Sequence, residues 1–68
     1  MKWDEVRNRW NQLKGDVKKT WEKLTDEDIE QIAGDRAELE RRLCRYYNID
    51  AGRAREQVDA WKRRRPQS

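Results

Sequence analysis

The sequence predicts an all-α fold, a compact bundle of short helices. Apolar residues recur at steps of three and four along almost the whole chain, the spacing that gathers side chains on one side of a helix. Residues typical of helix ends separate these runs, so each helix is short. The four tryptophans favour a packed core, although 46% charged residues and a mean hydropathy of -1.51 bring the composition close to that of disordered chains.

The first helix is predicted at about residues 3 to 23. Gly15 lies inside it, and because glycine costs about 1 kcal/mol relative to alanine in a helix, we expect a bend there. The apolar side of this helix is formed by Trp3, Val6, Trp10, Leu13, Val17, Trp21 and Leu24.

The second helix is predicted to start after Thr25, whose hydroxyl can cap the free backbone amides of the first turn. Leu24 and Ile29 fit a hydrophobic staple across this start. The helix is expected to run to Ala33 and to stop at Gly34, which can take the left-handed conformation.

The third helix is expected from Arg36 to Tyr47, with Asp35 as its cap and Glu38 completing a capping box. The residues expected on its apolar side are Leu39, Leu43 and Tyr46, with Ala37 and Tyr47 at the margins.

The last helix is expected between Asp50, which can cap its start, and Pro66, with Asn48 in the left-handed conformation before it. Its predicted apolar face holds Ala51, Ala54, Val58 and Trp61. The connections of one to three residues suit helices that turn sharply into their neighbours.

We predict a single domain over residues 1–65 and a disordered tail at 66–68. Trp3 is the tryptophan expected to be the least buried, because helix ends fray. The predicted core consists of Trp10, Leu13, Val17, Trp21, Leu24, Ile29, Ile32, Leu39, Leu43, Val58 and Trp61.

Positive charge is concentrated in the second half of the chain. Residues 1–34 carry 7 basic and 8 acidic side chains, and residues 35–68 carry 10 and 6, so the net charges are -1 and +4. A basic cluster could contact an anionic partner, with Trp61 stacking on a base, or it could simply be a solvated helix end that complements the helix dipole. The cluster consists of Arg53, Arg55, Lys62, Arg63, Arg64 and Arg65.

Other polar residues favour structural roles. The acidic group Asp26, Glu27, Asp28 and Glu30 could be a cation site, but its spacing favours helix-start electrostatics. Arg36 falls on an apolar line, where its stem can cover the core while its head pairs with a carboxylate; a partner contact is the alternative. Cys44 is expected to be a passive, half-buried thiol.

The composition argues against an enzyme. The chain has no histidine, one cysteine and no glycine-rich phosphate loop, so we expect no catalytic residues, no metal site and no cofactor. The single cysteine fits a reducing compartment, and the chain has neither an apolar run of membrane-spanning length nor a signal peptide. We therefore expect a cytoplasmic protein without a membrane partner, and the sequence leaves the oligomeric state open.

Several segments of the chain form a pattern that extends over nearly its whole length. They are Trp10-Asn11-Gln12-Leu13-Lys14-Gly15, Trp21 with Leu24-Thr25-Asp26-Glu27-Asp28, Gly34 with Arg36 and Leu39, and finally Tyr47, Ala54, Val58 and Trp61. This pattern resembles that of the CsbD-like family of small hydrophilic bacterial stress proteins. The resemblance implies four to five helices in two orthogonally packed hairpins, and no known activity. The chain departs from the family pattern at Arg41 and Asn48, where glycine is frequent.

The leading interpretation is a non-enzymatic protein of the general stress response that acts through its charged helical surface on an unknown macromolecular partner. One alternative is a nucleic-acid-binding module that uses the C-terminal basic cluster. The other is a largely disordered hydrophilic protectant.

Overall fold

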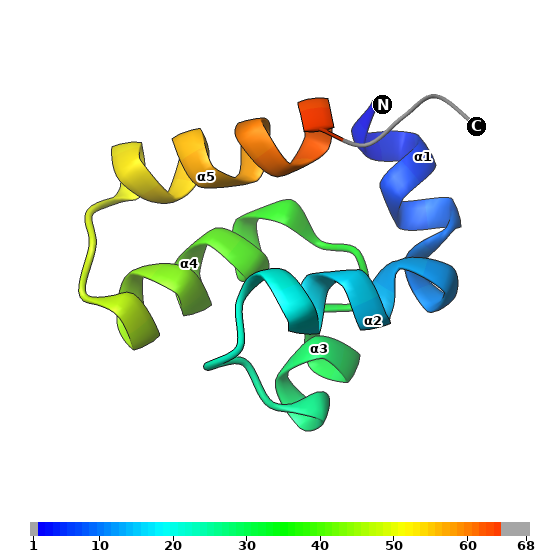
Figure 1. Ribbon diagram of the computed structural model, residues 1–68, viewed down its shortest axis with the longest axis horizontal. Coiled ribbons are helices and arrows are strands. Elements are labelled where there is room, and N and C mark those ends of the chain that lie inside the picture. The colour runs from blue at the N-terminus through cyan, green and yellow to red at the C-terminus, as the bar shows by residue number, and fades with distance from the viewer. Residues whose placement is uncertain (1, 65–68) are drawn as a thin grey trace.

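Five helices follow one another in the computed structural model, which describes residues 2–64 (Figure 1). They are α1 (Trp3–Asn8), α2 (Trp10–Thr20), α3 (Asp26–Ile32), α4 (Arg36–Tyr47) and α5 (Ala51–Arg64). No strand occurs in this range, so the all-α prediction is confirmed. Arg65 and the predicted tail at 66–68 lie outside the described residues, and the domain boundaries stay a prediction.

Helices α4 and α5 lie side by side and antiparallel, joined by a short connection at residues 48–50 (Figure 1). Helix α2 packs on α3, and it also contacts α5. Asp16 in its C-terminal half accepts from Trp61 of α5, and Trp21, the residue after its end, donates to Gln57 of α5. Helix α1 lies near the C-terminal end of α5 (Figure 1). The result is a molecule of 32 × 24 × 18 Å around one core.

The structure buries every residue that the sequence assigns to the core, and adds Val6 and Ala54 to it. Trp3 is only partly buried, whereas the other three tryptophans are at most 5% exposed. Ala51 is exposed, contrary to its predicted place on the apolar face of α5. It is the first residue of that helix.

The first predicted helix is divided at Arg9, and the expected bend at Gly15 is wrong. Arg9 leaves helical geometry (φ -107°, ψ 19°) between α1 and α2, whereas Gly15 lies inside α2, where a Cβ would meet nothing within 4 Å. Helix α2 also ends at Thr20, three residues before the predicted end. The break at Arg9 turns α1 aside, so that the indole N–H of Trp3 donates to the Gly34 carbonyl at 2.8 Å.

The cap of α3 is confirmed in detail. The Thr25 hydroxyl accepts from the Asp28 amide at 3.0 Å, and the Thr25 amide donates to the Asp28 carboxylate at 3.0 Å. The helix ends one residue earlier than predicted, because Ala33 itself takes the left-handed conformation (φ 49°) ahead of Gly34 (φ 84°). A Cβ at Gly34 would lie 3.1 Å from the Arg7 backbone, so the close approach of α1 requires glycine there.

Half of the capping box predicted for α4 is wrong. The Asp35 carboxylate accepts from the amides of Ala37 and Glu38, as expected. The Asp35 amide donates to the Ile32 carbonyl and not to the Glu38 carboxylate. The Glu38 carboxylate pairs with Arg41 and Arg42 instead. At the other end of α4, Asn48 takes the predicted left-handed conformation (φ 55°).

Candidate interaction surfaces

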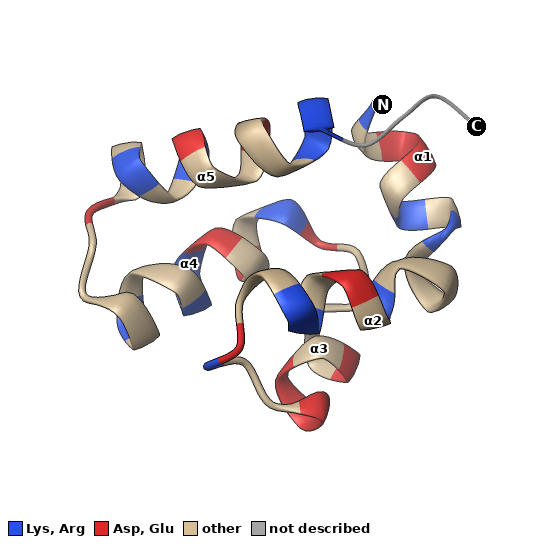
Figure 2. Cartoon of the chain, viewed as in Figure 1, with Lys and Arg blue, Asp and Glu red and all other residues tan. Residues whose placement is uncertain are grey.

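The basic residues predicted as one cluster are divided over α5. Figure 2 shows basic segments at both ends of this helix with an acidic segment between them. Helical spacing places Arg53 and Arg64 on one side, together with Gln57, and Arg55 and Lys62 on another. Arg63 is one turn beyond Asp59 and lies at the edge of the side that carries Arg55 and Lys62. Arg65 lies outside the described residues, and the described residues of the cluster do not form a single basic patch.

The two sides of α5 also differ in their charge. Asp59 lies between Arg55 and Lys62, and the Arg36 guanidinium, helped by Lys62 and Arg63, lowers the pKa of its carboxyl group. The side that carries Arg53 and Arg64 holds neutral Gln57 between them. Of these two sides, the one that carries Arg53 and Arg64 has no acidic residue between its cations.

Trp61 is packed in the core and cannot stack on a base. Its side chain is 1% exposed, its indole N–H donates to the Asp16 carboxylate at 2.6 Å, and its ring lies 5.7 Å from that of Trp21. Trp3 covers it further with an edge-on contact at 6.5 Å. The aromatic half of the predicted nucleic-acid site is therefore absent from this surface.

Asp28 is the one buried charged residue of the described chain, and it links α3 to α4. It caps α3, accepts from the Arg42 guanidinium at 2.6 Å, and accepts from the Tyr46 hydroxyl at 2.8 Å. Arg42 in turn binds Glu38 and the Gln31 amide oxygen. Every oxygen of the carboxylate is thus engaged in holding α4 against the start of α3.

The same contacts shift the pKa values of Asp28 and Tyr46. Hydrogen bonds from the Thr25 backbone, Tyr46 and Arg42 outweigh the effect of burial and lower the pKa of Asp28 from 3.8 to about 2. The bond to Asp28, together with burial, raises the pKa of Tyr46. With a pKa of about 2 the Asp28 carboxylate is charged at neutral pH, and all its partners belong to the fold, so its role is structural.

Arg36 pairs with carboxylates, as predicted from its position in line with apolar residues. Its guanidinium donates to Glu40 and to Asp59, each at 2.7 Å, and lies 5.6 Å from the centre of the Trp3 ring. Partial burial opposes its charge, but the two carboxylates outweigh it and raise its pKa. Arg36 therefore joins α4, α5 and α1, and is engaged within the fold.

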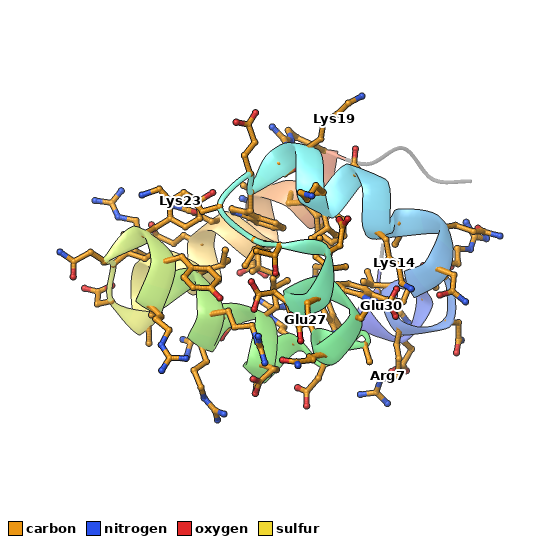
Figure 3. The ribbon with its side chains drawn as sticks, turned by 90° about the horizontal axis from the view of Figure 1, so that it is seen from below. Arg7, Lys14, Lys19, Lys23, Glu27 and Glu30 are labelled. Atoms are coloured by element: carbon orange, nitrogen blue, oxygen red, sulfur yellow. The ribbon has the colours of Figure 1, made fainter. Side chains whose placement is uncertain are left out.

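A groove of about 360 Å³ runs between α2 and α3. Its lining residues are Lys14, Gly15, Lys18, Asp26, Ile29 and Glu30. Both of its lysines are paired, Lys14 with Glu30 at 2.5 Å and Lys18 with Asp26 at 2.9 Å. Figure 3 shows Lys14 and Glu30 beside one another between the two helices.

The acidic residues of α3 do not form a metal site in the part of the chain that the structure describes. No three side chains of histidine, cysteine, aspartate or glutamate are grouped so as to hold a metal ion within residues 2–64. Asp26 and Glu30 pair with lysines and Asp28 belongs to the buried network. Their placement fits the helix-start interpretation.

A second cleft, of about 280 Å³, opens between α5 and the C-terminal end of α2. It is lined by Thr20, Trp21, Tyr47, Gln57, Trp61 and Arg64. None of these is acidic, and Arg64 forms no ion pair with any residue from 2 to 64. Arg64 was predicted as a contact residue, but Gln57 was not. Gln57 follows Arg53 by four residues and precedes Arg64 by seven, and this spacing indicates that the three share one face of α5.

These features define a small, highly charged helical protein held together by tryptophans and partly buried arginine–carboxylate contacts. The chain is 39% identical over 61 residues to the UPF0337 protein YjbJ of Escherichia coli O6:H1, covering 90% of this chain and 88% of that protein. It is 45% identical over 64 residues to the UPF0337 protein msl9551 of Mesorhizobium japonicum, covering 94% and 96% of the two chains. The chain therefore belongs to the UPF0337 family.

A third relative, the UPF0337 protein RPA4217 of Rhodopseudomonas palustris, is 43% identical over 61 residues, which cover 90% of this chain and 92% of that one. No family model and no solved structure matches the chain. Among the described residues, no helix is long and apolar enough to cross a membrane.

Proposed function

We propose that this chain is a non-enzymatic, cytoplasmic stress-response protein of the CsbD-like type, which acts in stoichiometric amounts through its folded, charged surface. The observation that carries the proposal is its similarity to UPF0337 proteins of several bacteria over nearly the full length of both chains. The segments that resemble the CsbD-like pattern are also the ones that build this core and its caps, among them Trp21, Thr25 and Trp61.

The surface supports an action by reversible polar contact. No large hydrophobic side chain is exposed in residues 2–64, so this part of the surface offers a partner charge and hydrogen bonds. Contacts of that kind form fast, dissociate fast and weaken with salt. Such behaviour suits a protein that is needed in quantity and for a limited time.

The other two interpretations have less support. A nucleic-acid module would need the basic residues and Trp61 on one accessible face, but α5 divides the former and the core covers the latter. A disordered protectant would leave its tryptophans in water, whereas Trp10, Trp21 and Trp61 are each at most 5% exposed.

The test is a dose–response experiment in a bacterium that lacks its own copy of this gene. The protein is expressed at graded levels, and survival of osmotic shock and drying is plotted against its measured cellular concentration. A stoichiometric protein gives survival that keeps rising over at least a tenfold range of concentration. An enzyme would give full survival at the lowest levels, and that outcome contradicts the proposal.

A core variant separates the folded from the disordered mechanism in the same strains. Leu39 is fully buried, so Leu39→Asp should unfold the chain while hardly changing its composition. Survival should return to that of the deletion strain. Full protection by this variant would show that hydrophilic composition alone suffices.

A further inference from the structure

The cleft between α2 and α5 differs from the rest of the surface in the hydrogen-bond donors that it presents. We propose that it binds an extended acidic segment of a partner protein, and this inference rests on the proposed action through a macromolecular partner. The described lining of the cleft holds the Gln57 amide and the Arg64 guanidinium and contains no carboxylate. Two more cations lie near it, Lys23 over the Tyr47 ring and Arg53 on the face of α5 that carries Gln57 and Arg64.

Trp21 fixes the orientation of the Gln57 amide. Its indole N–H, which can only donate, bonds to the Gln57 side-chain oxygen at 3.1 Å. The amide nitrogen of Gln57 must therefore point away from the indole, and it donates to no residue in the described part of the chain. Two N–H groups are left in the cleft for an acceptor such as a peptide carbonyl.

One cation lines this cleft and a second lies beside it. Arg64 is the lining cation, and its guanidinium has no carboxylate partner between residues 2 and 64. The Lys23 ammonium lies 5.1 Å above the ring of Tyr47, which is a lining residue, and donates to the Tyr46 carbonyl at 3.4 Å. Arg53 shares the face of α5 that carries Gln57 and Arg64.

The spacing of these groups fits an extended chain. Arg53 and Arg64 are eleven residues apart on α5, or roughly 16 Å at 1.5 Å per residue. An extended peptide advances about 3.3 Å per residue, so a stretch of about five residues spans the two arginines. Acidic side chains near both ends of that stretch would reach the cations, while a central carbonyl accepts from Gln57.

The groove between α2 and α3 provides the internal comparison. Lys14 and Lys18 line it, but Glu30 and Asp26 already neutralise them. An acidic ligand there would have to displace two ion pairs of the protein itself. At the α2–α5 cleft the cations have no such competitor, so binding costs less.

Burial of the aromatic rings favours a peptide over single-stranded nucleic acid. Trp21 is 3% exposed and Trp61 is 1% exposed, so neither presents a face on which a base could stack. Tyr47 is half-buried, and the Lys23 ammonium lies over its ring at 5.1 Å. What the cleft offers is donors, and these match the carboxylates and carbonyls of an acidic peptide.

The experiment measures binding of a synthetic eight-residue peptide of alternating glutamate and serine by calorimetry at low salt, with the full chain. Wild type should bind it weakly, with an affinity that falls as salt rises. Arg64→Glu should weaken binding about tenfold, while Arg63→Glu, an equal charge change on the neighbouring exposed residue, should weaken it less than about threefold. Gln57→Glu keeps the acceptor for Trp21 but removes the donors, and it should also weaken binding.

Three results would overturn the inference: no binding by wild type, equal losses for Arg64→Glu and Arg63→Glu, or binding of an oligothymidylate of the same charge that is as tight as that of the peptide. None of these concerns the dose–response of survival, so the proposed function can stand or fail independently. If both hold, the strain that expresses Arg64→Glu should survive less well than the strain that expresses Arg63→Glu at the same concentration.

Discussion

The N-terminal three helices and the α4–α5 hairpin contribute different chemistry to the fold. The hairpin contributes one tryptophan, Trp61, whose indole N–H donates to Asp16. The N-terminal part contributes the other three, whose indole N–H groups bond to distant partners. Examples are Trp3 on Gly34, Trp10 on Ile29 and Trp21 on Gln57. The hairpin contributes guanidinium groups that bridge carboxylates. Apolar burial stabilises both parts, since Leu39, Leu43 and Val58 of the hairpin are fully buried, and in the hairpin the charged contacts also select the arrangement.

The largest expected effect comes from removing one of the anchoring tryptophans. Trp10→Ala deletes a ring that is 5% exposed and leaves the Ile29 carbonyl without its bond, so unfolding free energy should fall by about 3 to 5 kcal/mol. Loss of that size unfolds a domain this small, and urea titration by far-UV circular dichroism measures it. Trp3→Ala is the matched control, because Trp3 is partly exposed and should cost less. Equal losses at the two positions would contradict the burial gradient.

The next effect tests the charged side of the comparison. Asp28→Ala removes the carboxylate half of the capping box of α3 and the acceptor of both Arg42 and Tyr46, so we expect a loss of about 2 to 3 kcal/mol in urea titrations. Asp26→Ala is the control, because the Asp26 side chain is 89% exposed and pairs only with Lys18. A loss below about 1 kcal/mol at Asp28 would show that the network contributes specificity but little stability.

Asp28 also predicts the direction of the pH dependence. Its pKa is about 2 in the folded protein and 3.8 as a free side chain, so its contribution is complete above about pH 5. That contribution is lost as the pH falls through 4 toward 2, because the unfolded chain then binds the proton more readily. The urea midpoint should fall over this range, and Asp28→Asn should make the fall shallower. An unchanged slope in this variant would mean that other carboxylates carry the acid sensitivity.

Local signals predicted the caps and the core, whereas the placement of α1 could not be predicted from them. Thr25 and Asn48 act through neighbouring residues, so their roles can be read from a few positions. The break at Arg9 depends on the bond from Trp3 to Gly34, which are 31 residues apart, and no local pattern contains it. The predicted bend at Gly15 was wrong because glycine permits a bend in a helix but does not cause one.

For the candidate surface, too, local features could be predicted and contacts between distant residues could not. The basic residues were recognised by type, but their run in the sequence suggested a patch that the helical geometry divides. Gln57 carried no charge and no motif, and its significance depends on Trp21, 36 residues away. Sequence reasoning could therefore identify the charges of this surface, but the contacts between helices decide which of them share a cleft.

A pair of glycine substitutions gives the smallest effects and tests where the chain bends. Gly34→Ala places a Cβ at φ 84° and 3.1 Å from the Arg7 backbone, so α1 should be displaced at a cost of about 1 to 2 kcal/mol. Gly15→Ala adds a methyl group in open space inside α2 and should stabilise the protein by about 0.5 to 1 kcal/mol. Thermal unfolding of both variants beside wild type gives the two signs. If Gly15→Ala also destabilised the protein, α2 would need flexibility at Gly15 after all, and the turn at Arg9 would not be the only bend between Trp3 and Thr20.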